Sequence, residues 1–187
     1  MTEAVLDKNK DLARQYRDIL SPAGYLVAVK MLKSLQGFEG IKKPARPRTL
    51  CQLLSQTRYT GRTALVTAEN LACYAAGPFL GLGVDLPESA AKRYVGWQYA
   101  NDEASQKTLD AVPKFERNSY KGMLITPLER CAVTPDVVLF FGNIAQILVG
   151  MNAYLRNRGG TLNFDASHYG TCAYAIVPPM KNNLPTM

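Results

Sequence analysis

Apolar residues recur at helical spacing over residues 3–20, where the repeat consists of Val5, Leu12, Tyr16, Ile19 and Leu20. A helix buries such a stripe against the rest of a protein, and the Ser21-Pro22 pair that follows is a typical stop signal. The same signals predict further helices over residues 49–59, 87–98, 101–112, 143–158 and 170–177. The last of these is predicted to end before Pro178-Pro179, because proline does not continue a helix.

Short apolar runs between these helices have the length and composition of strands. They predict strands over residues 25–32, 63–67, 120–126, 136–141 and 162–164, and a tight turn with a short helix over 68–82. Helices and strands alternate without a regular βαβ rhythm, and the sequence has no internal repeat. We therefore expect a single domain over residues 1–187, of the α/β or α+β class, with a mixed β-sheet flanked by helices.

The stretch from residue 37 to 48 is interrupted by glycine and proline and is rich in cations. It predicts a basic exposed loop, with Lys42, Lys43, Arg46 and Arg48 as candidates for binding an anion. The formal net charge of +7 favours acidic partners, which include nucleic acid, an anionic lipid surface, an acidic protein and a small anionic molecule, and charge alone does not choose among them. We expect an anionic small molecule or an acidic protein. Nucleic acid is not expected, because only Tyr59 lies near these cations to stack on a base.

Composition sets the class of protein and its expected location. Hydrophobic residues make up 47% of the chain and charged residues 20%, which is typical of a folded globular protein. The N-terminal segment carries charges throughout and lacks the apolar block of an export signal. The apolar runs fall short of the roughly 20 residues that span a membrane. We expect a cytoplasmic protein with reduced cysteines and no membrane segment.

The cysteines are the leading candidates for chemistry. Cys51 follows the expected helix cap Thr49, and Cys172 begins the last helix, so backbone N–H groups there would favour a thiolate. Cys73 lies among small residues that leave room around its sulfur. The alternative for each is a small buried hydrophobic residue, since no C-x-x-C pair is present. Cys131 is expected to be incidental.

A histidine next to the last cysteine is the other candidate. His168 precedes Cys172 closely and suits a metal ligand or a general base, which makes Cys172 and His168 the catalytic candidates. The alternative is a solvated loop side chain. No hydrolase, zinc-protease or nucleotide-binding motif occurs in the required context.

Several short segments, in their order and spacing, resemble the prokaryotic family called domain of unknown function number 169, which is common among anaerobic bacteria and archaea. The resemblance covers most of the chain and is carried by Val27-Ala28-Val29-Lys30, Cys51-Gln52, Ala68-Glu69, Ala72-Cys73, Gly81-Leu82, Ala111-Val112-Pro113, Pro127-Leu128-Glu129, Pro135-Asp136-Val137-Val138, Gly142-Asn143, Gln146, Cys172-Ala173 and Pro178.

The resemblance implies that Cys51, Cys73 and Cys172, but not Cys131, occupy the family's own cysteine positions, and therefore a thiolate-bound metal or iron–sulfur cluster. Two departures bear on that site. Leu71 stands where many members have a histidine, and the family's Gly-Cys segment beyond Met187 is absent here. The chain is then a shortened one, or three protein ligands leave an open position, or no cluster is bound.

Three functional hypotheses follow. The first is a thiolate-ligated metal or iron–sulfur protein of anaerobic metabolism, with the basic loop recruiting an anionic partner or substrate. The second is a cofactor-free subunit that binds a small anion or serves as an accessory protein. The third is a thiol enzyme. A homo-oligomer or a subunit of a larger assembly fits any of them.

Overall fold

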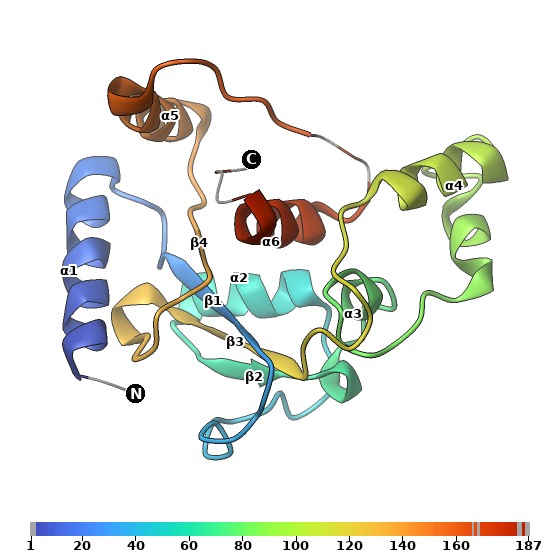
Figure 1. Ribbon diagram of the computed structural model, residues 1–187, viewed down its shortest axis with the longest axis horizontal. Helices are drawn as coiled ribbons and strands as arrows, with labels where there is room; N and C mark the ends of the chain where they lie inside the picture. Colours follow the sequence, from blue (N-terminus) through green and yellow to red (C-terminus); the bar gives the residue numbers. More distant parts are fainter. Residues whose placement is uncertain (1–2, 166, 168, 183–184, 186–187) are drawn as a thin grey trace.

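The computed structural model describes residues 3–165, 167, 169–182 and 185. In this part of the chain β1 (Val27–Leu32), β2 (Ala64–Val66), β3 (Gly122–Pro127) and β4 (Val137–Leu139) form one sheet in the order β2-β3-β1-β4 (Figure 1). Each of the three described pairings is antiparallel, so the prediction of a mixed sheet is wrong. Parallel neighbours need a crossover unit, and no such unit joins adjacent strands here.

One face of the sheet carries the main hydrophobic core. Alternate residues of β1, Val27, Val29 and Met31, point into it, as the pleat of a strand requires. Three helices cover this face: α2 (Leu50–Thr60), α3 (Ala76–Phe79) and α6 (Thr171–Asn182). Leu50, Phe79 and Ile176 are almost fully buried there, and each such side chain contributes about 1.5 to 3 kcal/mol.

The opposite face of the sheet is covered by the N-terminal helix α1 (Glu3–Leu20) and by a loop. Ala28 of β1 packs with Ala13 of α1 and with Leu128, which begins the short 3₁₀ helix η3 (Leu128–Arg130). Beside them, Leu32, Leu65 and Leu124 meet partly buried side chains of the loop that follows β1. Helices on two faces of an antiparallel sheet give an α+β fold, one of the two classes predicted.

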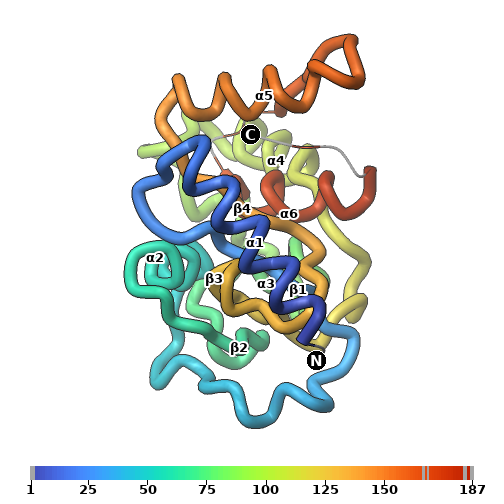
Figure 2. The backbone as a smooth tube through the Cα atoms, turned by 90° about the vertical axis from the view of Figure 1, so that its left-hand side faces the viewer, coloured from blue at the N-terminus to red at the C-terminus, as the bar shows by residue number. Residues whose placement is uncertain are grey.

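The remaining helices lie at the periphery. Two more 3₁₀ helices, η1 (Ala68–Asn70) and η2 (Glu88–Tyr94), flank α3, and α4 (Asp102–Ala111) packs against η2. The helix α5 (Ile144–Arg158) lies at the edge of the molecule, away from α2 and β2 (Figure 2). Among the helices that the structure describes, none combines the length and the apolar character needed to cross a bilayer.

Three local predictions are wrong. The predicted helix over 87–98 is a 3₁₀ helix that ends at Tyr94. Residues 162–164 form no strand. The helix predicted to end before Pro178 continues through Pro178 and Pro179 to Asn182, because Ala173, Ile176 and Val177 are buried in the core and hold the helix in place.

Candidate functional site

Two of the predicted site cysteines are brought together by a parallel β-bridge between Arg48 and Leu71. The backbone N–H of Arg48 donates to the Asn70 carbonyl (N–O 3.1 Å), and the N–H of Ala72 donates to the Arg48 carbonyl (2.9 Å). After the bridge, the segment of Arg48 continues into α2 and the segment of Leu71 continues toward α3. Cys51 and Cys73 thus follow the two paired segments on the same side of the bridge.

The start of α2 is fixed by a reciprocal cap. Thr49 Oγ1 accepts from the N–H of Gln52, and the Gln52 side chain accepts from the N–H of Thr49, as predicted for this boundary. Cys51 therefore lies in the first turn of α2, where its side chain is exposed.

Cys172 lies in the first turn of α6, at a crowded point of the chain. Gly170 precedes it with φ of 78°, and a Cβ placed on this glycine would lie 2.8 Å from Cγ1 of Val112. Only glycine fits such a position easily. Cys172 and Cys73 are both half-buried and pack against the main core.

Neighbouring thiols affect the pKa values of Cys51 and Cys172. Although Cys51 is exposed, partial desolvation of its thiol by the surrounding protein, followed by the neighbouring Cys73, raises its pKa. Burial raises the pKa of Cys172 to about 12, and Cys51 and Cys73 add to the rise. Backbone N–H groups at the two helix starts lower both pKa values, as the sequence suggested, but burial outweighs them. Cys51 and Cys172 are therefore neutral thiols at pH 7, and Cys172 lies close enough to Cys51 and Cys73 for their charges to affect it.

The described residues include no group of three or more His, Cys, Asp or Glu side chains arranged to hold a single metal ion. A single zinc or iron ion needs its sulfurs within a few ångströms of one another, because each metal–sulfur bond is about 2.3 Å long. The described residues therefore present no ready-made site for a single metal ion.

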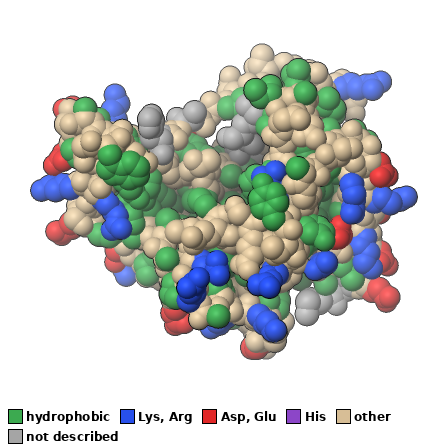
Figure 3. All heavy atoms as spheres, turned by 180° about the vertical axis from the view of Figure 1, so that it is seen from behind, with side chains coloured by type: hydrophobic (Ala, Val, Ile, Leu, Met, Phe, Trp, Pro, Cys, Tyr) green, Lys and Arg blue, Asp and Glu red, His purple; other side chains and the backbone are tan. Residues whose placement is uncertain are grey.

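The basic loop borders this site at one end only. Lys42, Lys43 and Arg46 are exposed, while Arg48 is half-buried, and none of the ion pairs found among the described residues involves them. Figure 3 shows Lys and Arg side chains gathered along the lower edge of this face, with a hollow above them beside the lobe formed by η2 and α4.

An open groove of about 490 Å³ runs along the exposed side of α2 and was not predicted. Arg48 and Cys51 form one end of it, and Tyr59 and Thr60 lie at the other; the remaining lining residues are Gln52, Ser55 and Gln56. The groove therefore joins one predicted anion-binding residue to one predicted thiolate.

A cluster of tyrosines flanks the other two cysteines and was also missed. The ring of Tyr94 lies 5.0 Å from that of Tyr169 and 6.2 Å from that of Tyr74, and the Arg93 guanidinium lies 4.5 Å from the Tyr74 ring. Burial raises the pKa of Tyr74 to about 12 and raises that of Tyr169 strongly, with Tyr74 and Tyr94 adding to the latter. The phenols of Tyr74 and Tyr169 therefore stay protonated at neutral pH.

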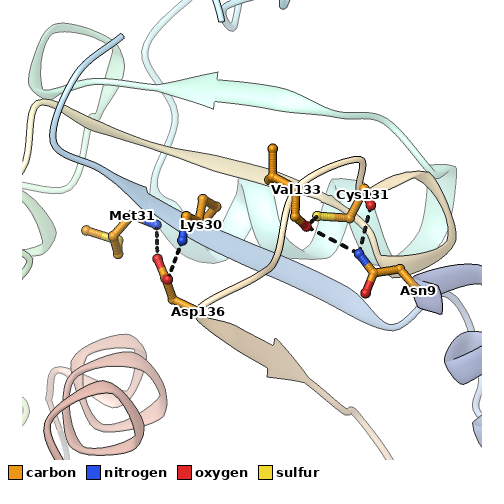
Figure 4. Close-up of polar contacts among 6 residues, drawn as sticks. All are labelled: Asn9, Lys30, Met31, Cys131, Val133 and Asp136. Carbon is orange, nitrogen blue, oxygen red and sulfur yellow. Dashed lines mark hydrogen bonds and ion pairs between the residues drawn. The ribbon is translucent and has the colours of Figure 1, made fainter. Parts of the chain in front are cut away.

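Two other predicted residues do not join this site. His168 lies outside the described residues. Cys131 packs with α1 on the opposite face of the sheet, where its thiol donates to the Val133 carbonyl (3.0 Å) and its own carbonyl accepts from the Asn9 side chain (2.8 Å; Figure 4). Burial raises the pKa of Cys131. Its separation from the other cysteines agrees with an incidental role.

Two further segments that carry the resemblance meet inside the sheet. The Asp136 carboxylate accepts from Lys30 Nζ and from the backbone N–H of Met31, both at 2.7 Å (Figure 4). The N–H of Asp136 donates to the Val29 carbonyl (2.9 Å). These contacts hold the start of β4 against β1, which is a structural role.

Comparisons with known proteins agree with the pattern of segments. The family model of the uncharacterised ArCR proteins, domain of unknown function number 169, matches residues 17–187. An uncharacterised protein of Methanocaldococcus jannaschii is 26% identical over 183 residues, which cover 95% of this chain and 78% of that protein. No solved structure matches. The chain belongs to the domain of unknown function 169 family.

Proposed function

We propose that this protein binds a thiolate-ligated iron–sulfur centre through Cys51, Cys73 and Cys172. The observation that carries the proposal is the convergence of three thiols from distant segments, each of which lies at a fixed turn of the backbone. Neighbouring thiols raise the pKa values of Cys51 and Cys172, so the thiolates would repel one another, and a bound soft cation removes that repulsion. Cysteine thiolates are the usual ligands of such centres.

The backbone around the thiols supports a negatively charged centre. Cys51 and Cys172 each lie in the first turn of a helix, where N–H groups lower the pKa of the thiol and would donate to cluster sulfur atoms. A centre held by these three residues alone would offer one iron for a substrate to bind. Arg48, at the end of the α2 groove beside Cys51, would attract an anionic substrate or an acidic partner.

A thiol enzyme is the weaker hypothesis. A cysteine nucleophile reacts as its thiolate, and such residues have a depressed pKa. Burial raises the pKa of Cys172 to about 12 and also raises that of Cys51. Neither residue has the electrostatic environment of an activated nucleophile.

Binding of a small anion without a cofactor is the second candidate function, and the α2 groove favours it. Arg48 has no acidic partner among the described residues, and the groove offers the amides of Gln52 and Gln56 and the hydroxyl of Ser55 beside it. A carboxylate or phosphate would fit this lining. In that case the cysteines would be packing residues.

The deciding experiment measures iron, zinc and acid-labile sulfide per chain in protein purified without oxygen. We expect stoichiometric iron and sulfide in the native protein and their loss in the Cys51→Ala/Cys73→Ala/Cys172→Ala variant. The Cys131→Ala variant is the matched control and should keep both. Zinc alone, or a metal-free protein that still binds phosphate through Arg48, would overturn the cluster and leave anion binding as the better function.

A further inference from the structure

The helix α5 is unusual because none of its residues is buried, although every residue of the helix is described. It begins at a reciprocal cap, in which Asn143 and Gln146 bind each other's backbone N–H. A helix of 15 residues is marginally stable in water unless it packs against something. In two views at right angles α5 lies at the rim of the molecule (Figures 1 and 2).

Several large apolar side chains of α5 are exposed, in addition to the exposed polar residues Asn152, Arg156, Asn157 and Arg158. Ile144 is 87% exposed, Leu148 51% and Val149 48%. Ile144, Leu148, Met151 and Leu155 follow one another at the alternating spacing of a coiled-coil seam. A side chain at Gly150 would meet no atom within 4 Å, so the space beside the seam is open.

The last turn of α1 extends this apolar surface. The Gln146 side chain donates to the carbonyls of Leu20 (2.7 Å) and Ser21 (3.0 Å), which joins the start of α5 to the end of α1. Ile19, in that last turn, is 72% exposed. A stable dimer buries about 800 Å² on each partner, more than one short helix offers, so the end of α1 is needed as well.

We propose that the seam of α5 pairs antiparallel with the α5 of a second copy of this chain. Charge complementarity selects this partner. The charged residues of α5 are Arg156 and Arg158, both in its last turn, and the exposed Asp18 lies in the last turn of α1, next to the start of α5. Antiparallel pairing about a two-fold axis places Arg156 and Arg158 of each copy beside Asp18 of the other copy. The symmetry makes this contact twice in the dimer.

The test is the sedimentation behaviour of the full chain over a wide range of protein concentration. We expect a reversible dimer, and we expect Leu148→Glu to weaken dimerisation about tenfold or more, because it puts a charge into the seam. Trp97→Glu is the matched control, since Trp97 is 70% exposed between η2 and α4, which lie on the other side of the molecule from α5 (Figure 1), and should leave the dimer unchanged. A native chain that is monomeric at every concentration, or a Leu148→Glu dimer of native affinity, would overturn the proposal.

Exchanging the charges of the two contact regions tests whether the partner is a second copy of this chain. This test does not depend on whether Leu148→Glu folds. Asp18→Arg alone and the Arg156→Asp/Arg158→Asp variant should each weaken the dimer, and their combination in one chain should restore it. Failure of the combined variant to restore dimerisation would exclude the antiparallel pairing. Circular dichroism should show native helix content in each variant, because the substituted side chains are exposed.

Discussion

Arg48 and Leu71, which lie on separate segments, form a parallel β-bridge that determines where two cysteines meet. The bridge is short, but it is followed by the capped start of α2 on one side and by the turn into α3 on the other. Cys51 and Cys73 therefore have their positions set by backbone hydrogen bonds and not by side-chain packing alone.

The titration of Cys172 should respond to its neighbours. Because the charges of Cys51 and Cys73 raise the pKa of Cys172, the Cys51→Ala/Cys73→Ala variant should show a lower Cys172 pKa than the native apoprotein. The pH dependence of Cys172 alkylation measures this. In the Cys131→Ala control the Cys172 pKa should stay as in the native chain. An unchanged pKa in the double variant would mean that the three thiols do not share a site.

Stability should fall at alkaline pH. The Cys172 thiol has an ordinary pKa of 9.0 and a folded-state pKa of about 12, so the folded protein holds this proton more tightly than the unfolded chain. Its contribution is fully present below pH 9 and is lost as pH rises from 9 toward 12. Urea unfolding midpoints of the apoprotein should decrease over this interval, and less steeply in Cys172→Ala. The buried Tyr74 acts in the same direction, so some decrease should remain in that variant.

The Asp136 carboxylate should stabilise the sheet. Asp136→Ala removes the acceptor for the Met31 N–H and the partner of Lys30, and should lower the free energy of unfolding by roughly 1 to 3 kcal/mol. Lys30→Met leaves the backbone hydrogen bond in place and should cost less, because the ion pair is partly exposed. Denaturant titration of both variants checks the order, and an equal loss in the two would contradict it.

Gly170 should control the position of Cys172. Gly170→Ala places a Cβ against Val112 at a φ of 78°, so we expect a loss of about 1 to 3 kcal/mol. Because α6 begins at the next residue, alkylation of Cys172 should also become faster. Val112→Ala in the same chain removes the clash but not the backbone strain, and should restore only part of the stability. Gly37→Ala also has a positive φ but open space around it, so it isolates the cost of strain alone.

Elements with strong local signals could be predicted from the sequence. The starts of α2, α4 and α5 are set by Thr49, Asn101 and Asn143, whose side chains cap the helix that follows. Tertiary packing overrides such a signal at Pro178, which sits within α6 because the core fixes that helix. The error over 87–98 is a local one, because the chain turns at Gly96, whose φ is 92°.

The surroundings of the candidate site could not be predicted from the sequence. The resemblance selected Cys51, Cys73 and Cys172 as ligands, which stays a prediction, and spacing alone gives no distance between them. The tyrosines were missed because the chain contains ten, and only the fold distinguishes Tyr74, Tyr94 and Tyr169 from the rest. The one available signal was that Tyr74 follows Cys73 and that Tyr169 closely precedes Cys172, and Tyr94 had no such signal.

Chemical modification of the buried Cys131 thiol would report on the unfolding of this chain. Its side chain is 1% exposed between α1 and the sheet, so an alkylating reagent reaches it only when that packing opens. Cys51 is exposed and reacts without any opening. With the reaction rate of an unstructured cysteine as reference, the slow modification of Cys131 gives the free energy of the opening that exposes it. Mass spectrometry of the two peptides from one sample would therefore separate local accessibility from opening of the core, with no added probe.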